Sequence, residues 1–367
     1  MAALRSFNYL PMAGMGEVIG YGPPNTGAVL SPDFMHGPYA PPKAKGAYDE
    51  FGWNIHSGVF EGAHAKLTRL DDASVQRRSL GKDRWHIVLA DGICARDSYH
   101  DGDWLGPHIG EAVGIEIEGE PVRVNLMDDV PIDGRCEDTA VLISHFWAPN
   151  YAHSLLETAS RFWAFDTFDM LKDLPVVWDA VTPWQRALAD ILAKDRIAPL
   201  PANRTQFREL YVPSFHSQIG VSPQAVRWLR GKFDAPDGPG KKRIFVSRAD
   251  ATERRIVNEN EVIDLLKPMG FETVMLTGMS VAEQRQLFGE AECVVMPHGA
   301  GCANMIFAGT GTKIIEFVPK SYQHHMFWHI AKWSGHWYAR LISEDGANKD
   351  MRADLTALRR ALEAGGL

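Results

Sequence analysis

The sequence has few cysteines and no long apolar run. Four cysteines occur in 367 residues and no two form a CxxC pair, which argues against a disulfide scaffold and favours a reducing cytoplasm. No run of about 20 apolar residues is present, and the N-terminal residues lack the apolar core of a signal peptide. We therefore expect a cytoplasmic protein that neither spans a membrane nor is exported, with at most peripheral membrane contact.

A surplus of basic residues is also missing. The formal net charge is −8, so no global positive field attracts a polyanion, and nucleic acid is not an expected partner.

The length of 367 residues exceeds that of a usual single domain and indicates two. A loop rich in Gly, Pro and charge at 231–242 is the expected linker or exposed loop, with a domain boundary near 222–240.

The first 145 residues indicate irregular and β structure. Residues 1–60 are rich in Gly and Pro, which is typical of turns. From about 84 to 145, the apolar runs "RWHIVLA", "VGIEIEG", "VRVNLM" and "TAVLIS" alternate with turn residues and predict strands. From Asn150 the apolar residues Leu155, Leu156, Ala159, Phe162 and Trp163 recur at helical spacing, and predict a helix that ends near Asp166.

The C-terminal half alternates strand and helix patterns. Strands are predicted at 243–248, 271–276, 293–297 and 313–319, with helices at 258–269, at 280–289 and from about 302. This alternation is typical of a parallel, doubly wound α/β sheet. Capping boxes are expected from Asn258 to Glu261 and from Ser280 to Glu283.

In the segment "VVMPHGAGCANMIF", a histidine and two glycines follow directly after the predicted strand 293–297. Ligands bind outside the carboxyl ends of parallel strands, where glycines allow positive φ or close approach and a following helix offers amides to an anion. The spacing from Gly299 is GxGxxN rather than GxGxxG, so NAD is only weakly indicated. A diphosphate suits the turn, and a plain strand-to-helix turn is the alternative.

Charged residues accompany this turn. Glu316 lies inside an apolar strand and needs a partner, for which a ribose diol, an internal arginine or solvent at the strand end are the alternatives. Arg248 ends the first predicted strand of this half, and Arg254 and Arg255 follow it, where guanidinium forks suit phosphate oxygens. An exposed basic loop is the alternative interpretation of the three arginines.

Three motifs follow one another along the chain: "NYAHSLLE" at 150–157, "RIFVSRADATERRIVNENEV" and "AEQRQLFGEAECVVMPHGAGCANMIFAGTGTKIIEF". Together they resemble glycosyltransferase family 61, which includes plant xylan-decorating, animal protein O-GlcNAc and bacterial polysaccharide-synthesis transferases. The resemblance covers roughly 140–340, with Cys302 at a position that is commonly Leu in the family. It implies GT-B architecture, in which two Rossmann-like domains face a cleft, and sugar transfer with inversion and without a metal or other cofactor.

The resemblance divides the chain into an N-terminal acceptor-side domain at 1–225, whose residues 1–140 form a β-rich irregular extension, and a Rossmann-like nucleotide-sugar domain at 226–340. Residues 341–367 are predicted to form a C-terminal helix that packs back on the N-terminal domain. The implied nucleotide-binding residues are Arg248, Arg254, Arg255, Asn258, Glu259, His298, Gly299, Ala300, Gly301, Asn304 and Glu316.

A candidate base lies in "NYAHSLLE". His153, Glu157 and Arg161 are spaced by four and share one helix face. The resemblance favours His153 as base, oriented by Glu157, with Glu157 acting directly as the second choice and a solvated helix face as the alternative. Tyr151 and Arg161 are expected on the acceptor or donor-sugar side.

The predicted activity is transfer of a sugar from a nucleotide sugar, expected to be a UDP-sugar, to a polysaccharide or glycoconjugate acceptor. Two other functions remain open at this point. One is a nucleotide-sugar epimerase or hydrolase on the same scaffold, and the other is a non-catalytic nucleotide-sugar or glycan-binding subunit. The partners are then the donor and the acceptor, with self-association into a homo-oligomer left open.

Overall fold

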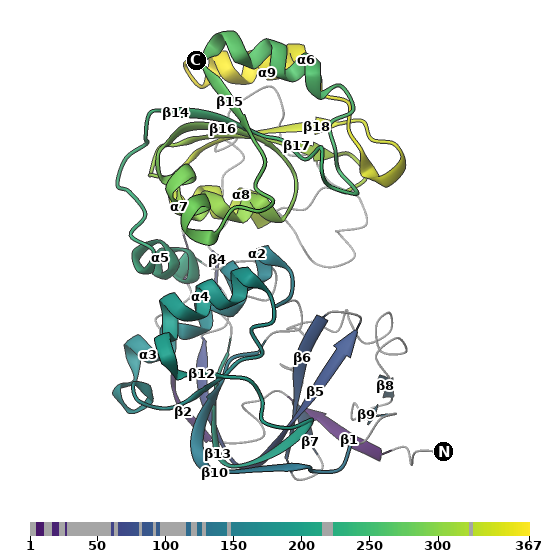
Figure 1. The fold of residues 1–367 in the computed structure, drawn as a ribbon, viewed down its shortest axis with the longest axis vertical. Helices are drawn as coiled ribbons and strands as arrows, with labels where there is room; N and C mark the ends of the chain where they lie inside the picture. The colour runs from purple at the N-terminus through teal and green to yellow at the C-terminus, as the bar shows by residue number, and fades with distance from the viewer. Residues whose placement is uncertain are drawn as a thin grey trace. The chain divides into compact units, whose positions relative to one another are not determined.

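The computed structural model divides into two compact units, each described by itself (Figure 1). Unit 1 comprises Met1–Asn25 and Gly62–Ala225, and unit 2 comprises Thr26–Glu61 and Val226–Leu367. The residues described are 5–10, 17–21, 26–27, 60–61, 65–80, 83–90, 93–95, 115–118, 123–126, 130–144, 148–214, 223–322 and 326–367. Most of the Gly- and Pro-rich region at 1–60 lies outside them.

Unit 1 contains an 11-stranded sheet in which a parallel part continues into a largely antiparallel part. The strand order is β12-β11-β10-β13-β5-β6-β7-β1-β9-β8, with β2 paired to β5. The parallel part consists of β10 (Gly134–Leu142), β11 (Val176–Val177), β12 (Ile197–Ala198) and β13 (Arg204–Pro213). The other strands are β1 (Arg5–Leu10), β2 (Glu17–Tyr21), β5 (Lys66–Leu80), β6 (Asp83–Ala90), β7 (Ile93–Ala95), β8 (Ile115–Glu118) and β9 (Arg123–Leu126). Strands β3 (Thr26–Gly27) and β4 (Phe60–Glu61) pair separately.

The four apolar runs predicted as strands overlap with β6, β8, β9 and β10, so this prediction is confirmed. The N-terminal region is nevertheless not a separate extension. Strand β5 pairs antiparallel with β13 from Leu67 opposite Pro213 to Gln76 opposite Arg204, so the antiparallel strands continue the parallel ones. A Rossmann-like parallel sheet in unit 1 is therefore limited to β10 to β13. Sequence patterns missed this continuity because they do not reveal which strands pair.

The predicted helix after Asn150 changes its winding along its length. It consists of α2 (Tyr151–His153), a π-helical turn η5 (Ser154–Thr158), a 3-10 turn η6 (Ala159–Phe162) and α3 (Trp163–Thr167). Asn150 caps it by accepting a hydrogen bond from the Ala152 amide at 2.9 Å. The predicted apolar stripe is buried, as expected. The remaining helical segments are η7 (Asp169–Leu171), α4 (Pro183–Ala193) and η8 (Lys194–Arg196), with a capping box at the start of α4.

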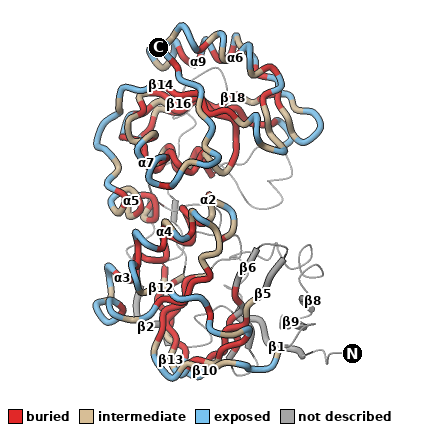
Figure 2. Tube along the Cα trace, in the orientation of Figure 1, coloured by how far each residue is buried: buried red, intermediate tan, exposed pale blue. Residues whose placement is uncertain are grey.

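Unit 2 is a five-stranded parallel sheet with the order β15-β14-β16-β17-β18. Its strands are β14 (Lys242–Val246), β15 (Phe271–Val274), β16 (Ala291–Pro297), β17 (Lys313–Pro319) and β18 (Trp337–Ser343). The four strands predicted for this half are therefore confirmed, and β18 is an additional strand. Figure 2 shows the central strands as buried, in agreement with the apolar runs that define them.

The helices of unit 2 lie on both faces of this sheet, with α6 and α9 on one face and α7 and α8 on the other (Figure 1). They are α6 (Glu259–Leu266), which continues into a 3-10 turn η9 (Lys267–Met269), α7 (Val281–Gly289), α8 (Met326–Ser334) and α9 (Leu355–Ala364). A further 3-10 turn is η11 (Ala347–Lys349). Helix α5 (Pro223–Lys232) spans the boundary between the units, and residues 233–241 form a mostly exposed loop before β14.

Three local expectations in unit 2 need correction. The helix after Gly301 is a 3-10 helix, η10 (Ala300–Phe307), rather than an α-helix. Asn258 precedes α6 but makes no side-chain cap, whereas the predicted Ser280 capping box is present. Helix α9 packs within unit 2, because its apolar stripe, which includes Leu358 and Leu362, joins the core formed by β14, β16, β17, β18 and α6.

Among the described helices, none has both the length and the apolar character needed to cross a bilayer.

Candidate functional site

The strand order of unit 2 locates its most favourable ligand position. In chain order, the sequence of strands across the sheet is 2-1-3-4-5, and the direction of winding reverses between β14 and β16. In such sheets, ligands bind outside the carboxyl ends of the two strands at the reversal. Arg248 follows the end of β14 and the turn His298-Gly299 follows the end of β16. The topology therefore brings the predicted arginine and the predicted glycine turn to the same edge.

The glycine turn is shaped to admit a guanidinium. A Cβ atom placed on Gly299 would lie 2.2 Å from Arg248 Nη1 and 2.8 Å from its Cζ. The φ angle of Gly299 is 170°, which any residue adopts, so the requirement for glycine is one of space. On Gly301, a Cβ atom would lie 2.8 Å from a methyl group of Leu276. The predicted close approach to the glycine backbone is thus confirmed, although the approaching group is an arginine of the chain itself. The predicted positive φ is not found.

Substituting Gly299 tests this packing. Gly299→Ala is expected to displace Arg248 and to lower the free energy of unfolding by about 1 kcal/mol, because the added methyl collides with the end of a flexible side chain that can swing away. Chemical denaturation measures the change. The matched control is Gly231→Ala in α5, where a Cβ atom meets nothing within 4 Å and helix propensity favours alanine by about 0.5–1 kcal/mol. Equal stability of Gly299→Ala and the unmodified chain would contradict the packing.

Two guanidiniums lie together at this edge. Burial lowers the pKa of Arg248, and the charge of Arg254 lowers it further. The Nε atoms of both arginines are buried and have no hydrogen-bond partner among the described residues. Arg254 has a φ of 57°, an unusual conformation for a non-glycine residue that is often found at functional sites. Two partly buried cations, each with an unsatisfied Nε donor, form a site suited to an anion.

Arg254 is held from several sides. Its amide donates to the Asn348 carbonyl at 3.0 Å, and its Nη2 lies 2.7 Å from Glu253 Oε1. The guanidinium carbon lies 5.5 Å from the centre of the Tyr322 ring, a cation–π distance. Lys349 Nζ lies 4.4 Å from the same ring centre. These contacts fix the position of Arg254 and bring a third cation close to it.

Glu316 is bound entirely by groups of the chain. Because side chains alternate along β17, Glu316 points away from the face that carries Ile315 and Phe317, toward the side opposite α6 and α9. Its Oε1 lies 2.5 Å from His298 Nδ1, and its Oε2 accepts a hydrogen bond from the Tyr338 hydroxyl. Glu316 is 1% exposed, so the predicted alternative of a solvated strand end is wrong. The partner is a histidine and a tyrosine, rather than an arginine or a free ribose.

The contacts of Glu316 with His298 and Tyr338, which together form a buried triad, keep His298 in one position. Burial first, and then the charge of Glu316, raise the pKa of Tyr338 well above its usual value, so the phenol remains a donor. The His298 ring is 5.1 Å from Phe327 and 5.6 Å from Tyr322, measured between ring centres. Sequence analysis missed Tyr338, because its place opposite the strand bearing Glu316 emerges only from the pairing of β18 with β17. His298 is therefore positioned by a buried carboxylate.

Several predicted binding residues are occupied by structural contacts. Arg255 Nη2 lies 2.6 Å from Asp350 Oδ2, and its amide donates to the other oxygen of that carboxylate at 2.8 Å. The Asn258 amide group bonds the Ala353 backbone in both directions, at 3.1 and 2.8 Å. Asn304 is fully buried and its Nδ2 donates to Gln284 at 2.7 Å. These three residues hold loops and helices of unit 2 together.

Glu259 has one carboxylate oxygen without a partner among the described residues. Ser247, which follows β14, donates its hydroxyl to Glu259 Oε1 at 2.7 Å. The other carboxylate oxygen, Oε2, is buried and has no hydrogen-bond partner among the described residues. Glu259 lies in the first turn of α6, next in space to the strand that ends before Arg248. A hydroxyl donor would satisfy this oxygen.

The second group of predicted residues lies in unit 1. His153 Nδ1 is 2.5 Å from Glu157 Oε2, and this contact lies in the stretch where α2 passes into the π-helical turn. The His153 side chain is 24% exposed and that of Glu157 only 3%. Arg161 is buried and donates Nη1 to the Pro213 carbonyl at 2.9 Å, whereas Tyr151 packs edge-on against Trp184. The alternative of a solvated His/Glu/Arg face is wrong, because Glu157 and Arg161 are buried.

The His153–Glu157 pair has the arrangement of an oriented base. A buried carboxylate that accepts the Nδ1 proton leaves the imidazole lone pair on Nε2, the nitrogen that takes up a proton in such pairs. π-Helical turns occur often at functional sites. The structure thus confirms the contact between the two residues, and the role of His153 as base remains a prediction.

Comparison with known proteins agrees with this distribution of residues. Residues 151–315 match the family Glycosyltransferase 61. A beta-1,2-xylosyltransferase of Arabidopsis thaliana is 30% identical over 151 residues, which are 37% of this chain and 26% of that protein. The chain thus spans about a quarter of the length of this curated relative. The segment that resembles glycosyltransferase family 61 is thus residues 151–315, which hold the His153–Glu157 pair, the arginines and the glycine turn.

Proposed function

We propose that the chain is an inverting glycosyltransferase that moves a sugar from a nucleotide-sugar donor, a UDP-sugar, to a hydroxyl of a polysaccharide or glycoconjugate. The match of residues 151–315 to glycosyltransferase family 61 supports the general class. The name of the Arabidopsis relative supports a glycosyl donor, and xylose is accordingly one of the sugars to be tested. In this proposal, unit 2 binds the donor and unit 1 supplies the base.

The observation that carries the donor assignment is the Arg248–Arg254 pair at the winding reversal of unit 2. A nucleoside diphosphate brings negative oxygens that satisfy the buried Nε donors of both arginines. The charge that develops on the departing diphosphate is stabilised by the same guanidiniums, so the proposal assigns this task to the chain rather than to a metal. Glu259 Oε2 is positioned to accept a ribose hydroxyl, the role first expected for Glu316.

His298 is proposed to face the donor sugar or a phosphate oxygen. Its Nδ1 is fixed by Glu316, and Tyr338 fixes Glu316 in turn. A ring held by a buried carboxylate keeps its orientation while the substrate reacts, which is the value of preorganisation. The predicted contribution of Glu316 to nucleotide binding is therefore indirect and acts through His298.

In unit 1, His153 is proposed to take the proton of the acceptor hydroxyl as that oxygen attacks the anomeric carbon of the sugar. Attack from the side opposite the leaving diphosphate inverts the configuration, and one base is sufficient for such a single displacement. Glu157 orients His153 and stabilises the imidazolium that forms. Tyr151 is proposed to contact the acceptor, whereas Arg161 supports the helix through Pro213.

Removing one guanidinium tests the donor site. Arg248→Ala is expected to weaken binding of UDP by about 1.5–3 kcal/mol, because one charge-assisted contact to phosphate is lost, which is roughly 10–150-fold in Kd. Isothermal titration calorimetry with UDP and uridine separates phosphate from base recognition, since uridine should not distinguish the variants. Arg285→Ala is the matched control, because Arg285 is an exposed residue of α7 that pairs with Asp234. Unchanged UDP affinity in Arg248→Ala would refute the assignment.

A further inference from the structure

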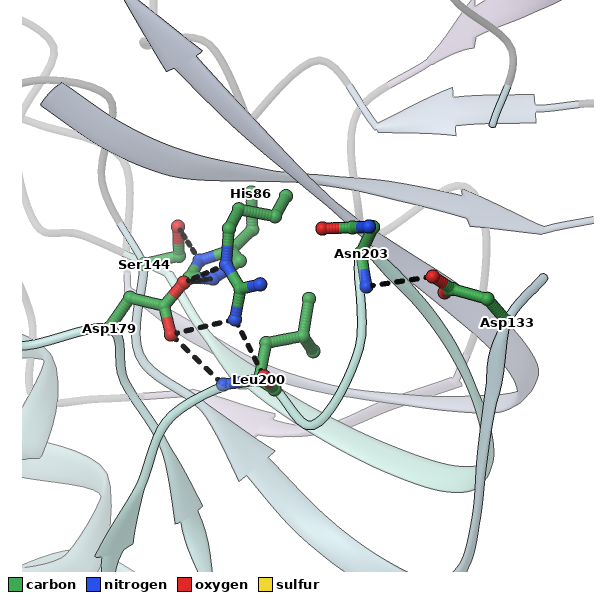
Figure 3. Close-up of polar contacts among 7 residues, drawn as sticks. His86, Asp133, Ser144, Asp179, Leu200 and Asn203 are labelled. Atoms are coloured by element: carbon green, nitrogen blue, oxygen red, sulfur yellow. Dashed lines mark hydrogen bonds and ion pairs between the residues drawn. The ribbon is translucent and has the colours of Figure 1, made fainter. Parts of the chain in front are cut away.

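A second polar cluster lies in unit 1, apart from the His153–Glu157 pair, and is drawn in Figure 3. Ser144 comes two residues after the end of β10, and Asp179 two residues after the end of β11. These two strands are parallel neighbours, so their carboxyl ends lie at one sheet edge. His86 reaches this edge from β6. Ligands of α/β sheets bind at such an edge.

The three side chains form a continuous hydrogen-bonded chain. His86 Nδ1 lies 2.9 Å from Ser144 Oγ, and His86 Nε2 lies 3.1 Å from Asp179 Oδ2 (Figure 3). His86 is 2% exposed and Asp179 4%, whereas Ser144 is only partly buried. The buried end of the chain is thus the carboxylate, and the end nearest solvent is the hydroxyl.

Asp179 is anchored without the help of the histidine. Arg77 Nε lies 2.6 Å from Asp179 Oδ2, and the Leu200 amide donates to Oδ1 at 3.0 Å. Burial alone would raise the pKa of Asp179, but the hydrogen bonds from His86 and Arg77 outweigh burial and hold the pKa well below its usual value. The carboxylate is therefore ionised at neutral pH. A structural carboxylate would already be satisfied by Arg77 and Leu200, so the contact of Asp179 with His86 is additional.

An ionised Asp179 determines which nitrogen of neutral His86 carries the proton. A carboxylate only accepts hydrogen bonds, so Nε2 is the protonated nitrogen and Nδ1 carries the lone pair. Ser144 then donates its hydroxyl proton to Nδ1. A serine hydroxyl that donates to an imidazole, which in turn donates to a buried carboxylate, is the arrangement of an activated serine nucleophile, here with the two ring nitrogens exchanged.

We propose that Ser144 is a nucleophile that accepts an acyl group from a carboxylic ester, with His86 as general base and Asp179 and Arg77 as positioning residues. Ser144 Oγ attacks the ester carbonyl carbon while its proton passes to His86 Nδ1. The bond from that carbon to the alcohol oxygen then breaks, and His86 returns the proton to the departing alcohol. Water, deprotonated by His86, hydrolyses the acyl-serine and regenerates the hydroxyl.

This activity is separate from the proposed sugar transfer. Ser144 and His86 precede residues 151–315, which match the transferase family, and neither residue was singled out by the sequence motifs. An ester-cleaving centre on a chain proposed to act on glycans fits substrates whose sugar hydroxyls carry acyl groups. The proposal depends only on the cluster and remains testable if the chain transfers no sugar.

The test is labelling of the full-length protein with a fluorophosphonate, a reagent that reacts covalently with activated serines. We expect one adduct on the peptide that contains Ser144, mapped by mass spectrometry, and hydrolysis of p-nitrophenyl acetate that the reagent abolishes. His86→Asn should slow labelling by about 10²-fold or more, the range of general-base catalysis. Ser321→Ala should change nothing, because Ser321 is an exposed serine that bonds Asp345 directly, without a histidine between them.

Mapping on the unmodified chain gives an answer even if His86→Asn does not fold. The absence of an adduct on Ser144 would overturn the proposal, as would an adduct on Ser144 that forms equally fast in folded His86→Asn. Loss of the adduct in Ser144→Ala, with an unchanged thermal midpoint, would confirm the site of reaction.

Discussion

His153→Ala is expected to lower the rate of sugar transfer by about 10²–10⁴-fold and to leave the affinity for UDP unchanged. The rate loss is the usual contribution of a positioned general base. Affinity is preserved because His153 belongs to unit 1, whereas the proposed donor site is in unit 2. The measurement is release of UDP from a panel of UDP-sugars that includes UDP-xylose, with and without oligosaccharide acceptors, alongside calorimetric binding of UDP.

The design also separates the two candidate bases. The His153 side chain is 24% exposed, so added imidazole can reach the space left in His153→Ala and should restore part of the rate. Glu157→Ala should not be rescued by imidazole if Glu157 only orients the ring. Two outcomes would contradict a transferase. One is release of UDP from UDP-sugars without any acceptor, and the other is a binding function that neither substitution affects. Loss of UDP affinity in His153→Ala would refute the division between the units.

The second large effect is on stability. Glu316→Ala is expected to lower the free energy of unfolding by about 2–6 kcal/mol, because it leaves two buried groups, His298 and Tyr338, without their partner, at about 1–3 kcal/mol each. UDP affinity should fall as well, since His298 loses its orientation. Chemical denaturation and calorimetry measure the two effects independently.

A matched comparison identifies the cause. Glu283→Ala removes an exposed carboxylate that caps α7, and should cost only about 0.5–2 kcal/mol with no change in UDP affinity. Tyr338→Phe removes one of the two donors to Glu316 and should fall between the two variants. A loss in Glu316→Ala no larger than that in Glu283→Ala would show that the buried triad is not important for stability.

The regular part of unit 2 could be predicted from the sequence because its strands are continuous apolar runs. "CVVMP" and "KIIEFVP" are buried on both sides, and Ser280 with Glu283 marks a helix start through local contacts alone. The alternation of strands and helices also placed Arg248 and the glycine turn at the carboxyl edge of a parallel sheet, whereas the strand order emerged only from the structure. Local chemistry therefore predicted both the elements and the position of the candidate donor site.

The parts that escaped prediction depend on contacts between distant residues. Asn258 has the sequence of a helix cap, yet its amide bonds Ala353, 95 positions later. Arg255 resembles its neighbour Arg254 in sequence, and only the approach of Asp350 distinguishes a structural arginine from one with an unsatisfied donor. In the same way, Ser144 meets His86 only because the antiparallel strands of unit 1 continue its parallel sheet. Pairing across the chain, rather than local pattern, assigns these roles.

The central claim is that unit 2 binds a nucleoside diphosphate through Arg248 and Arg254, and one measurement tests it most directly. Denaturation of the full chain is followed with and without UDP, GDP, ADP and their sugar conjugates. We predict that nucleotides of one nucleobase give saturable stabilisation, which amounts to about 2.7 kcal/mol at a ligand concentration 100 times Kd. The same ligand should give a much smaller shift in Arg248→Ala. No stabilisation by any nucleotide, or an equal shift in Arg248→Ala, would contradict the account.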